Sequence, residues 1–274
     1  MIKCIALDRE FETKEEMFVA LKAAKKELLS LKMSKTYKSI QKGGLYTAFY
    51  SPGATKAIQG LEAGFIYPII SNTKYMDSHM DVHMDNSMNR TVDHQQGKVY
   101  YAVNHDLSIG KIIAYPRDVE MMLKEIAWTD IGKDFSGTTQ ALMFKTKTFD
   151  YSNKDAVGAI ENKAPVQNSI RMQYKDMAMA INSDDPDFAE EKAEWDENIE
   201  KIVNKKVAIE AGYFFPVKEL SIEQEGSMVI RGSNDATPII LPDSSKGTPE
   251  DGSSVDTQKT AEDSQKLFYE NLTK

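Results

Sequence analysis

One segment of the chain reads Gln167-Asn168-Ser169-Ile170-Arg171-Met172-Gln173-Tyr174. Apolar and polar side chains alternate along it, so a β-strand here directs Ile170 and Met172 to one face and Ser169 to the other. Such a strand would hold the Ser169 hydroxyl on the polar face of a rigid element. The apolar phase shifts just afterwards, which predicts a β-bulge near Lys175-Asp176.

A second long strand is expected from Tyr213 to Ile230. Its alternation puts Glu225, Ser227 and Val229 on one face. Two neighbouring strands that each carry a polar residue inside an apolar pattern are a natural frame for a site.

The rest of the chain interleaves predicted strands and helices. The capping box Thr13-Lys14-Glu15-Glu16 starts a helix whose apolar stripe runs from Met17 to Leu31. That stripe packs either on its own domain or, as a short coiled-coil-like contact, on a partner or second copy. Further strands are expected over 2–7, 98–103, 110–115 and 138–149, and further helices over 118–128, 153–162 and 187–206. The order predicts an α+β fold with helices around a mostly antiparallel β-sheet.

A chain of 274 residues can build one sizeable core with a small appended region. We expect an N-terminal strand-helix and loop region over residues 1–70, a main domain over 71–240 and a flexible acidic C-terminal tail over 241–274. The tail is rich in Ser, Gly, Thr and Asp and has too few apolar residues to order itself, although its last segment, 265–272, is expected to fold on a partner.

Composition narrows the classes of partner. The 34 basic residues are outnumbered by 42 acidic ones, and no basic stripe follows the chain, which disfavours direct binding of nucleic acid. No apolar run approaches the roughly 20 residues of a membrane helix, and no basic-then-apolar signal segment opens the chain, so we expect a cytoplasmic protein without a membrane partner. The lone Cys4 cannot form an internal disulfide and is expected in the core.

Three polar residues in separate segments can together supply serine-nucleophile chemistry. Serine is a poor nucleophile at neutral pH, and it needs an imidazole to take its proton and a third group to orient that imidazole. His105, Ser169 and Glu225 can fill these roles in that chain order. By parity alone Glu219 and Glu223 share the face of Glu225 if the strand is unbroken.

The segments around these residues resemble the caudovirus prohead (capsid maturation) serine proteases, a family related to the herpesvirus assemblins. The matching motifs are His105-Asp106 with Ile109-Gly110, Ser169-Ile170-Arg171-Met172, and Glu225-Gly226-Ser227-Met228-Val229 with Asn234. The resemblance covers roughly residues 75–240, and it is the three motifs in the correct order that carry it. The motif around Glu225 is also what selects this carboxylate over Glu219 and Glu223.

The resemblance implies a serine endopeptidase that processes scaffold and major capsid precursor proteins during phage prohead maturation. Ser169 would be the nucleophile, His105 the base and Glu225 the residue that orients the base, in a protease domain over 71–240. An assemblin-like sheet or barrel with surrounding helices is implied, with self-association, without a cofactor, and inside the assembling procapsid in the host cytoplasm. Arg171 and Arg231 are the candidate donors to the oxyanion.

Two other functions stay open at the level of sequence. In the segment Asp77-Ser78-His79-Met80-Asp81-Val82-His83-Met84-Asp85, a strand would put carboxylates and imidazoles on one face, as in a metal-dependent hydrolase. His79 and His83 would then lie about 13 Å apart at roughly 3.3 Å per residue, so only neighbours such as Asp81 and His83 would meet at one ion, and we assign no metal. The other alternative is a non-catalytic capsid-assembly or scaffold-binding protein that uses the helix over 13–32 and the acidic tail.

Overall fold

A computed structural model describes residues 1–34, 37–38 and 58–242. Residues Met1–Pro242 form one compact unit. The expected tail beyond residue 242, with its segment 265–272, and much of the expected N-terminal loop region, residues 39–57, lie outside the described residues.

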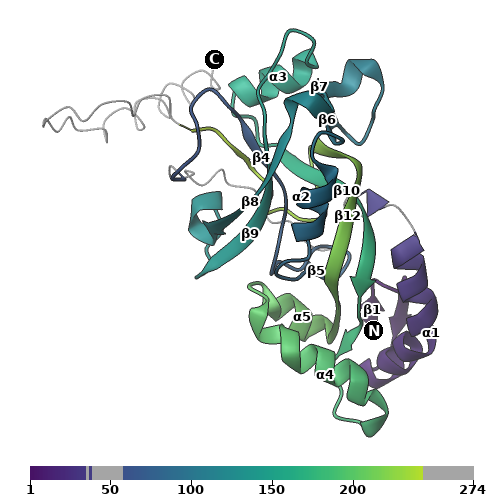
Figure 1. The fold of residues 1–274 in the computed structure, drawn as a ribbon. Coiled ribbons are helices and arrows are strands. Elements are labelled where there is room, and N and C mark those ends of the chain that lie inside the picture. Colours follow the sequence, from purple (N-terminus) through teal and green to yellow (C-terminus); the bar gives the residue numbers. More distant parts are fainter. Residues whose placement is uncertain (35–36, 39–57, 243–274) are drawn as a thin grey trace, which may run out of the picture. The chain divides into compact units, whose positions relative to one another are not determined.

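Strands and helices are interleaved along the described chain (Figure 1). The strands are β1 (Ile2–Cys4), β2 (Arg9–Phe11), β3 (Tyr37–Lys38), β4 (Tyr67–Asn72), β5 (Asp81–His83), β6 (Tyr100–Val103), β7 (Ile112–Ala114), β8 (Glu120–Ala127), β9 (Thr138–Lys145), β10 (Gln167–Met177), β11 (Ala180–Ile181), β12 (Tyr213–Val229) and β13 (Ile239–Ile240). The α-helices are α1 (Lys14–Ser34), α2 (Asn89–Gln95), α3 (Lys154–Glu161), α4 (Ala189–Asn198) and α5 (Lys205–Ala211).

The long strand β12 organises the larger sheet, whose order is β3-β10-β12-β6-β7 with β5 and β11 also paired to β12. It runs antiparallel to β10 and parallel to β5 and β6, so this sheet is mixed. A second sheet, β13-β4-β9-β8, is antiparallel, and β1 and β2 form a separate hairpin. The expected mixture of helices and sheets is confirmed, with more parallel pairing than expected. The barrel alternative is wrong for the described residues, in which the larger sheet ends at β3 and β7 and does not close.

The two sheets pack closely where β12 carries Gly226. A β-carbon at this position would lie 2.8 Å from both Ile70 Cγ2 on β4 and Phe144 Cε2 on β9. Carbon atoms do not approach so closely without displacement, so the glycine permits the close contact between the sheets. This contact lies directly between Glu225 and Ser227 in the chain.

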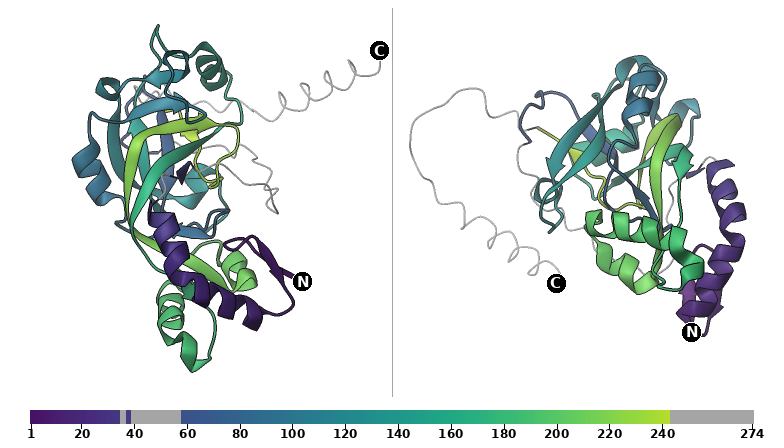
Figure 2. Two further views of the ribbon diagram at one scale, coloured as in Figure 1. Left: turned by 90° about the vertical axis from the view of Figure 1, so that its right-hand side faces the viewer. Right: turned by 60° about the horizontal axis from the view of Figure 1, so that its bottom comes forward.

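Helix α1 packs along β10, as Figure 2 shows from two further directions. The Thr13 hydroxyl accepts the Glu16 amide at 3.2 Å, as expected, whereas the Glu16 carboxylate accepts the amide of Glu12 instead of that of Thr13. Three residues of the predicted stripe, Met17, Leu21 and Leu28, are buried, which confirms packing on the helix's own domain. At the end of the helix Leu31 is exposed and Lys32 is buried in its place.

Two predicted helices are wrong. Residues 118–128 form mainly β8, because Glu120 to Ala127 pair with β9 from Lys145 back to Thr138. Residues 187–206 do not form one helix, since the chain leaves the helical path between α4 and α5. There the Asn204 side chain exchanges two hydrogen bonds of 2.9 Å with the backbone of Met76, and these tertiary contacts replace helical ones.

Three smaller predictions are confirmed. The register of β10 against β12 shifts on both sides of Asp176, where the bulge was expected. Cys4 is fully buried. The helix expected over 153–162 is α3, capped by the Asn153 side chain, which accepts the amide of Ala156.

In the part of the chain that the structure describes, no helix has the length and apolar character needed to cross a membrane.

Candidate active site

Three adjacent strands bring the predicted triad together. In the order β10-β12-β6, Ser169 lies opposite Ser227, and Ser227 lies opposite Ala102. Glu225 precedes Ser227 by two residues, and His105 follows β6 by two residues. The strand register therefore brings together three residues that are far apart in the sequence.

A tight turn after β6 carries His105 back over β12. The Asp106 amide donates to the Val103 carbonyl at 3.1 Å, and both central residues are left-handed, with φ of 55° at Asn104 and 57° at His105. Asparagine and histidine tolerate this region better than most residues, yet each such residue costs roughly 1–3 kcal/mol. The Asn104 amide donates to the Met228 carbonyl of β12 at 2.9 Å, which fixes the turn to the strand that holds Glu225.

The side chains of the triad form a continuous chain of hydrogen bonds. His105 Nδ1 lies 2.8 Å from Glu225 Oε1, and His105 Nε2 lies 2.8 Å from Ser169 Oγ. All three residues are buried, with 3% of His105, 2% of Ser169 and none of Glu225 exposed. Water therefore competes little for these contacts, and each hydrogen bond is stronger than it would be at the surface.

The chemistry of the partners assigns the protons. An ionised carboxylate can only accept hydrogen bonds. Nδ1 of His105 therefore carries a proton and donates the hydrogen bond to Glu225. Nε2 is then the unprotonated nitrogen, and it accepts the hydroxyl proton of Ser169. This is the tautomer that a general base needs in order to deprotonate serine.

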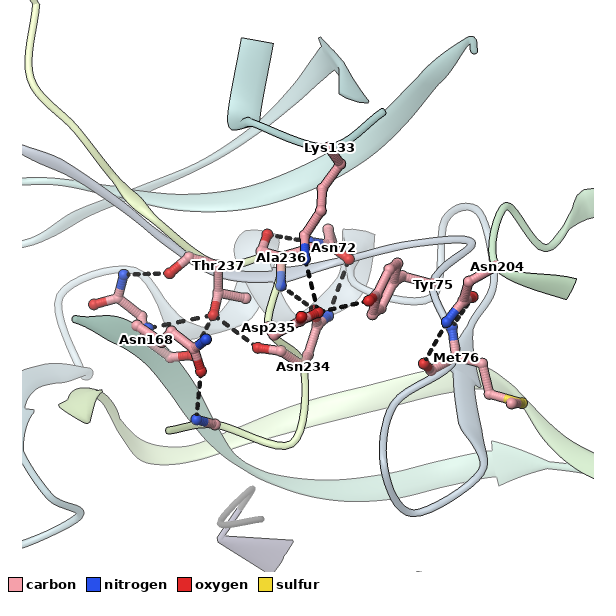
Figure 3. A network of polar contacts seen from close by, with 12 residues as sticks. Asn72, Tyr75, Met76, Lys133, Asn168, Asn204, Asn234, Asp235, Ala236 and Thr237 are labelled. Carbon is pink, nitrogen blue, oxygen red and sulfur yellow. Dashed lines mark hydrogen bonds and ion pairs between the residues drawn. The ribbon is translucent and has the colours of Figure 1, made fainter. Parts of the chain in front are cut away.

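Asn168, the residue before Ser169, is held by the loop that follows β12. The Thr237 carbonyl accepts the backbone amide and the side-chain amide of Asn168, each at 2.9 Å, and the Thr237 hydroxyl donates to the Asn168 carbonyl at 2.6 Å. Figure 3 shows these contacts and, on the same loop, Asp235 between Lys133 and Tyr75. From the other side the Tyr101 hydroxyl donates to Asn168 Oδ1 at 2.7 Å, and burial raises the pKa of Tyr101. Asn168 is thus held through its backbone by Thr237 and through its side chain by both Thr237 and Tyr101.

The expected face of carboxylates and imidazoles beside the site is not formed. Only Asp81 to His83 are in a strand, and the chain before them turns at Met80, whose φ is 65°. Asp77 accepts the amides of His79 and Asp81 and the hydroxyl of Ser233. The single-strand prediction for 77–85 is therefore wrong.

Asp81 and His83 are engaged with protein partners beside a small pocket that Ser169 also lines. Asp81 Oδ1 is 2.5 Å from Lys32 Nζ, and Oδ2 accepts the Tyr174 hydroxyl at 2.8 Å. His83 Nδ1 is 2.8 Å from Ser71 Oγ, and burial lowers the pKa of His83 to about 4, so the ring is neutral. Burial raises the pKa of Asp81, and Lys32 opposes that rise. Within the described ranges no three His, Cys, Asp or Glu residues are grouped to hold a metal ion.

The predicted oxyanion arginines are not joined to the triad by any described contact. Arg231 is exposed beyond the end of β12, and Arg171 is half-buried two residues after Ser169. Arg171 Nε is buried without a hydrogen-bond partner in the described part of the chain. Arg171 lies on the same strand as Ser169, and Arg231 follows the end of β12 by two residues.

The choice of carboxylate is decided by an irregularity in β12. Gln224 has a φ of 73°, and the pairing with β10 jumps from Gly226 to Ile222 while β10 advances by only two residues. β12 continues through this irregularity, but its alternation is interrupted between Glu223 and Glu225, so the two carboxylates do not share a face by simple parity. Glu219 instead forms an ion pair with Arg90 at 3.1 Å.

The role of Ser227 was not predicted from the sequence. Its hydroxyl donates to Glu225 Oε2 at 2.6 Å and accepts the His105 amide at 3.1 Å. Alternation had already put Ser227 on the face of Glu225, and that parity is the signal that identifies it. The contacts of Asn168 with the loop after β12 had no comparable signal, because they join residues 69 positions apart through a turn.

Comparisons with protein-family models, with curated proteins and with solved structures find no match.

Proposed function

We propose that this protein is a serine endopeptidase that processes scaffold and major capsid precursor proteins during the maturation of a phage prohead. The observation that carries the proposal is the hydrogen-bonded chain from Ser169 through His105 to Glu225, with both links at 2.8 Å. These residues also follow the order that the resemblance to prohead proteases requires. The proposal includes an assemblin-like fold and action inside the assembling procapsid, in the host cytoplasm.

The geometry supports the following sequence of steps. Ser169 Oγ attacks the carbonyl carbon of the scissile peptide bond while His105 Nε2 takes the hydroxyl proton. Glu225 stabilises the imidazolium through Nδ1–H. His105 then donates the proton to the leaving amine, which departs and leaves an acyl-enzyme. Water, deprotonated by the same nitrogen, releases the acid product and restores the hydroxyl of Ser169.

The oxyanion that forms in both halves of the reaction needs preorganised donors, each worth roughly 3–4 kcal/mol of barrier. Within this proposal Arg171 is the candidate side-chain donor, since its Nε is buried without a partner two residues beyond the nucleophile. Arg231, exposed beyond the end of β12, is the second candidate.

The test compares the purified chain with its Ser169→Ala variant, each incubated with a scaffold or capsid precursor and analysed by intact-mass spectrometry. We expect fragments only with the parent chain, and their masses locate the cleavage site. Identical fragments from both chains, or none from either with a competent precursor, would contradict the proposal. A metal-dependent hydrolase would lose activity with a chelator and keep it in Ser169→Ala, and a non-catalytic assembly protein would leave every assembly step unchanged in that variant.

A further inference from the structure

Ser227 joins both ends of the His105–Glu225 pair. Its hydroxyl oxygen accepts the backbone amide of His105 at 3.1 Å and donates its proton to Glu225 Oε2 at 2.6 Å. Glu225 Oε1, in turn, accepts from the His105 ring at 2.8 Å. The result is a closed ring of hydrogen bonds that runs through the backbone and side chain of the same histidine.

This ring meets two needs of the buried site. Glu225 and Ser227 are both fully buried, so any donor that the carboxylate needs must come from the protein or from a trapped water. A serine has one proton to give, and the short distance to Oε2 shows that Ser227 gives it to Glu225. With Oε2 engaged in this way, Oε1 is the oxygen that points at His105 Nδ1.

The second need arises from the left-handed turn at His105. Its φ of 57° turns the peptide amide of His105 towards β12, where a buried amide requires an acceptor. Ser227 Oγ is that acceptor. The backbone position of the base and the orientation of the carboxylate thus depend on one hydroxyl group.

We propose that Ser227 is a positioning residue for the catalytic pair, which sets the position of His105 relative to Ser169 and touches neither substrate nor the reacting atoms. The inference rests on the proposed serine chemistry of the same site. An error of about 1 Å in the position of a catalytic group costs on the order of a hundredfold in rate, and this is the size of effect expected when the hydroxyl is removed.

Ser87 provides a matched control. It is fully buried like Ser227, but its hydroxyl has no hydrogen-bond partner in the described part of the chain. Ser87→Ala therefore removes the same atom from a comparable environment without breaking a hydrogen bond. Ser227→Thr keeps a hydroxyl, and Ser227→Cys keeps nearly the same volume with only a weak donor.

The measurement is the second-order rate at which a fluorophosphonate, a reagent for activated serines, modifies Ser169 in folded full-length protein, with the modified residue identified by peptide mass spectrometry. We expect Ser227→Ala and Ser227→Cys to react about a hundredfold more slowly than the parent. Ser87→Ala should react at the parent rate, and Ser227→Thr should recover most of it. If Ser227→Ala does not fold, Ser227→Cys carries the comparison.

A proton NMR spectrum adds a readout that a purely structural serine would not change. The proton between His105 Nδ1 and Glu225 Oε1 should give a far-downfield resonance in the parent and in Ser87→Ala, and this resonance should move or disappear in Ser227→Ala. Rates and resonances equal in Ser227→Ala and Ser87→Ala would overturn the role of Ser227 and leave the protease proposal standing. A parent chain in which Ser169 is not modified at all would overturn both.

Discussion

Replacing Lys32 by methionine tests how α1 is held against the strands of the site. Lys32 Nζ lies 2.5 Å from Asp81 Oδ1 and 3.4 Å from the carbonyl oxygen of His79, and it sits 4.4 Å from the centre of the Phe215 ring. Methionine keeps an unbranched apolar side chain of similar length and removes the charge. The variant therefore isolates the ionic contact from the packing of the lysine stem.

The expected loss is large because Asp81 remains buried after its partner is removed. Breaking one half of a buried ion pair costs about 3–5 kcal/mol, out of a total stability of roughly 5–15 kcal/mol for a domain. The Tyr174 hydroxyl still donates to Asp81 at 2.8 Å, which favours the lower part of that range.

The loss should also depend on pH. Burial already raises the pKa of Asp81 and Lys32 opposes the rise, so removal of Lys32 raises it further. The folded variant then holds a proton that the unfolded chain has released, and its stability falls as pH rises through this window. The destabilisation should thus be greatest near pH 7 and partly relieved near pH 5.

Urea denaturation at pH 7 and at pH 5 measures both effects. The control is Lys26→Met, since Lys26 is exposed on the same helix and should change stability by less than about 0.5 kcal/mol. In the double variant with Asp81→Asn, the two losses should be less than additive. Equal midpoints for Lys32→Met and Lys26→Met, or a loss that is the same at both pH values, would show that the ion pair between Lys32 and Asp81 does not stabilise the fold.

Three further outcomes follow from the structure. Gly226→Ala pushes a methyl group against Phe144 and should lower the free energy of unfolding by about 1–3 kcal/mol, measured by urea denaturation. A midpoint equal to that of the parent would show that the two sheets can accommodate the methyl group. His83 has a pKa of about 4 in the folded protein against an ordinary 6.5, so the unfolded chain binds a proton that the folded chain does not, and about 3 kcal/mol of stability is lost as pH falls from 6.5 to 4. His83→Gln should flatten this dependence of stability on pH, and an unchanged dependence would show that His83 is not its source. Glu225→Gln keeps the shape of the side chain but presents an amide to His105 Nδ1, which should slow fluorophosphonate modification by roughly 10³–10⁴-fold, and a rate near that of the parent would remove Glu225 from the triad.

The parts of the fold that the sequence predicted well are those with a strong local pattern. The alternation around Ser169 and the capping box at Thr13 both correspond to observed elements, because local side-chain direction and local hydrogen bonds decide them. The helix expected over 118–128 is instead a strand. Its apolar residues fit a helical spacing, but tertiary pairing with β9 decides the outcome.

Prediction of the site likewise depended on whether a feature is set by the local sequence or by tertiary contacts. The resemblance named His105, Ser169 and Glu225 in chain order, and the structure brings these three together. It could not reveal the hydroxyl of Ser227 as a bridge, because that role exists only after a left-handed turn presents the His105 amide to β12. Alternation places Ser227 on the face of Glu225, but the contact of its hydroxyl with the His105 amide depends on the tertiary structure.

The parallel pairing of β6 with β12 has a consequence for when the triad can exist during synthesis. His105 and Glu225 are 120 positions apart, and β12 is the last of the three site strands to leave the ribosome. A nascent chain that has exposed only His105 and Ser169 carries a base with no carboxylate to orient it and no strand for its turn to rest on. The hydrogen-bonded chain from Ser169 through His105 to Glu225 can therefore form only after β12 has emerged.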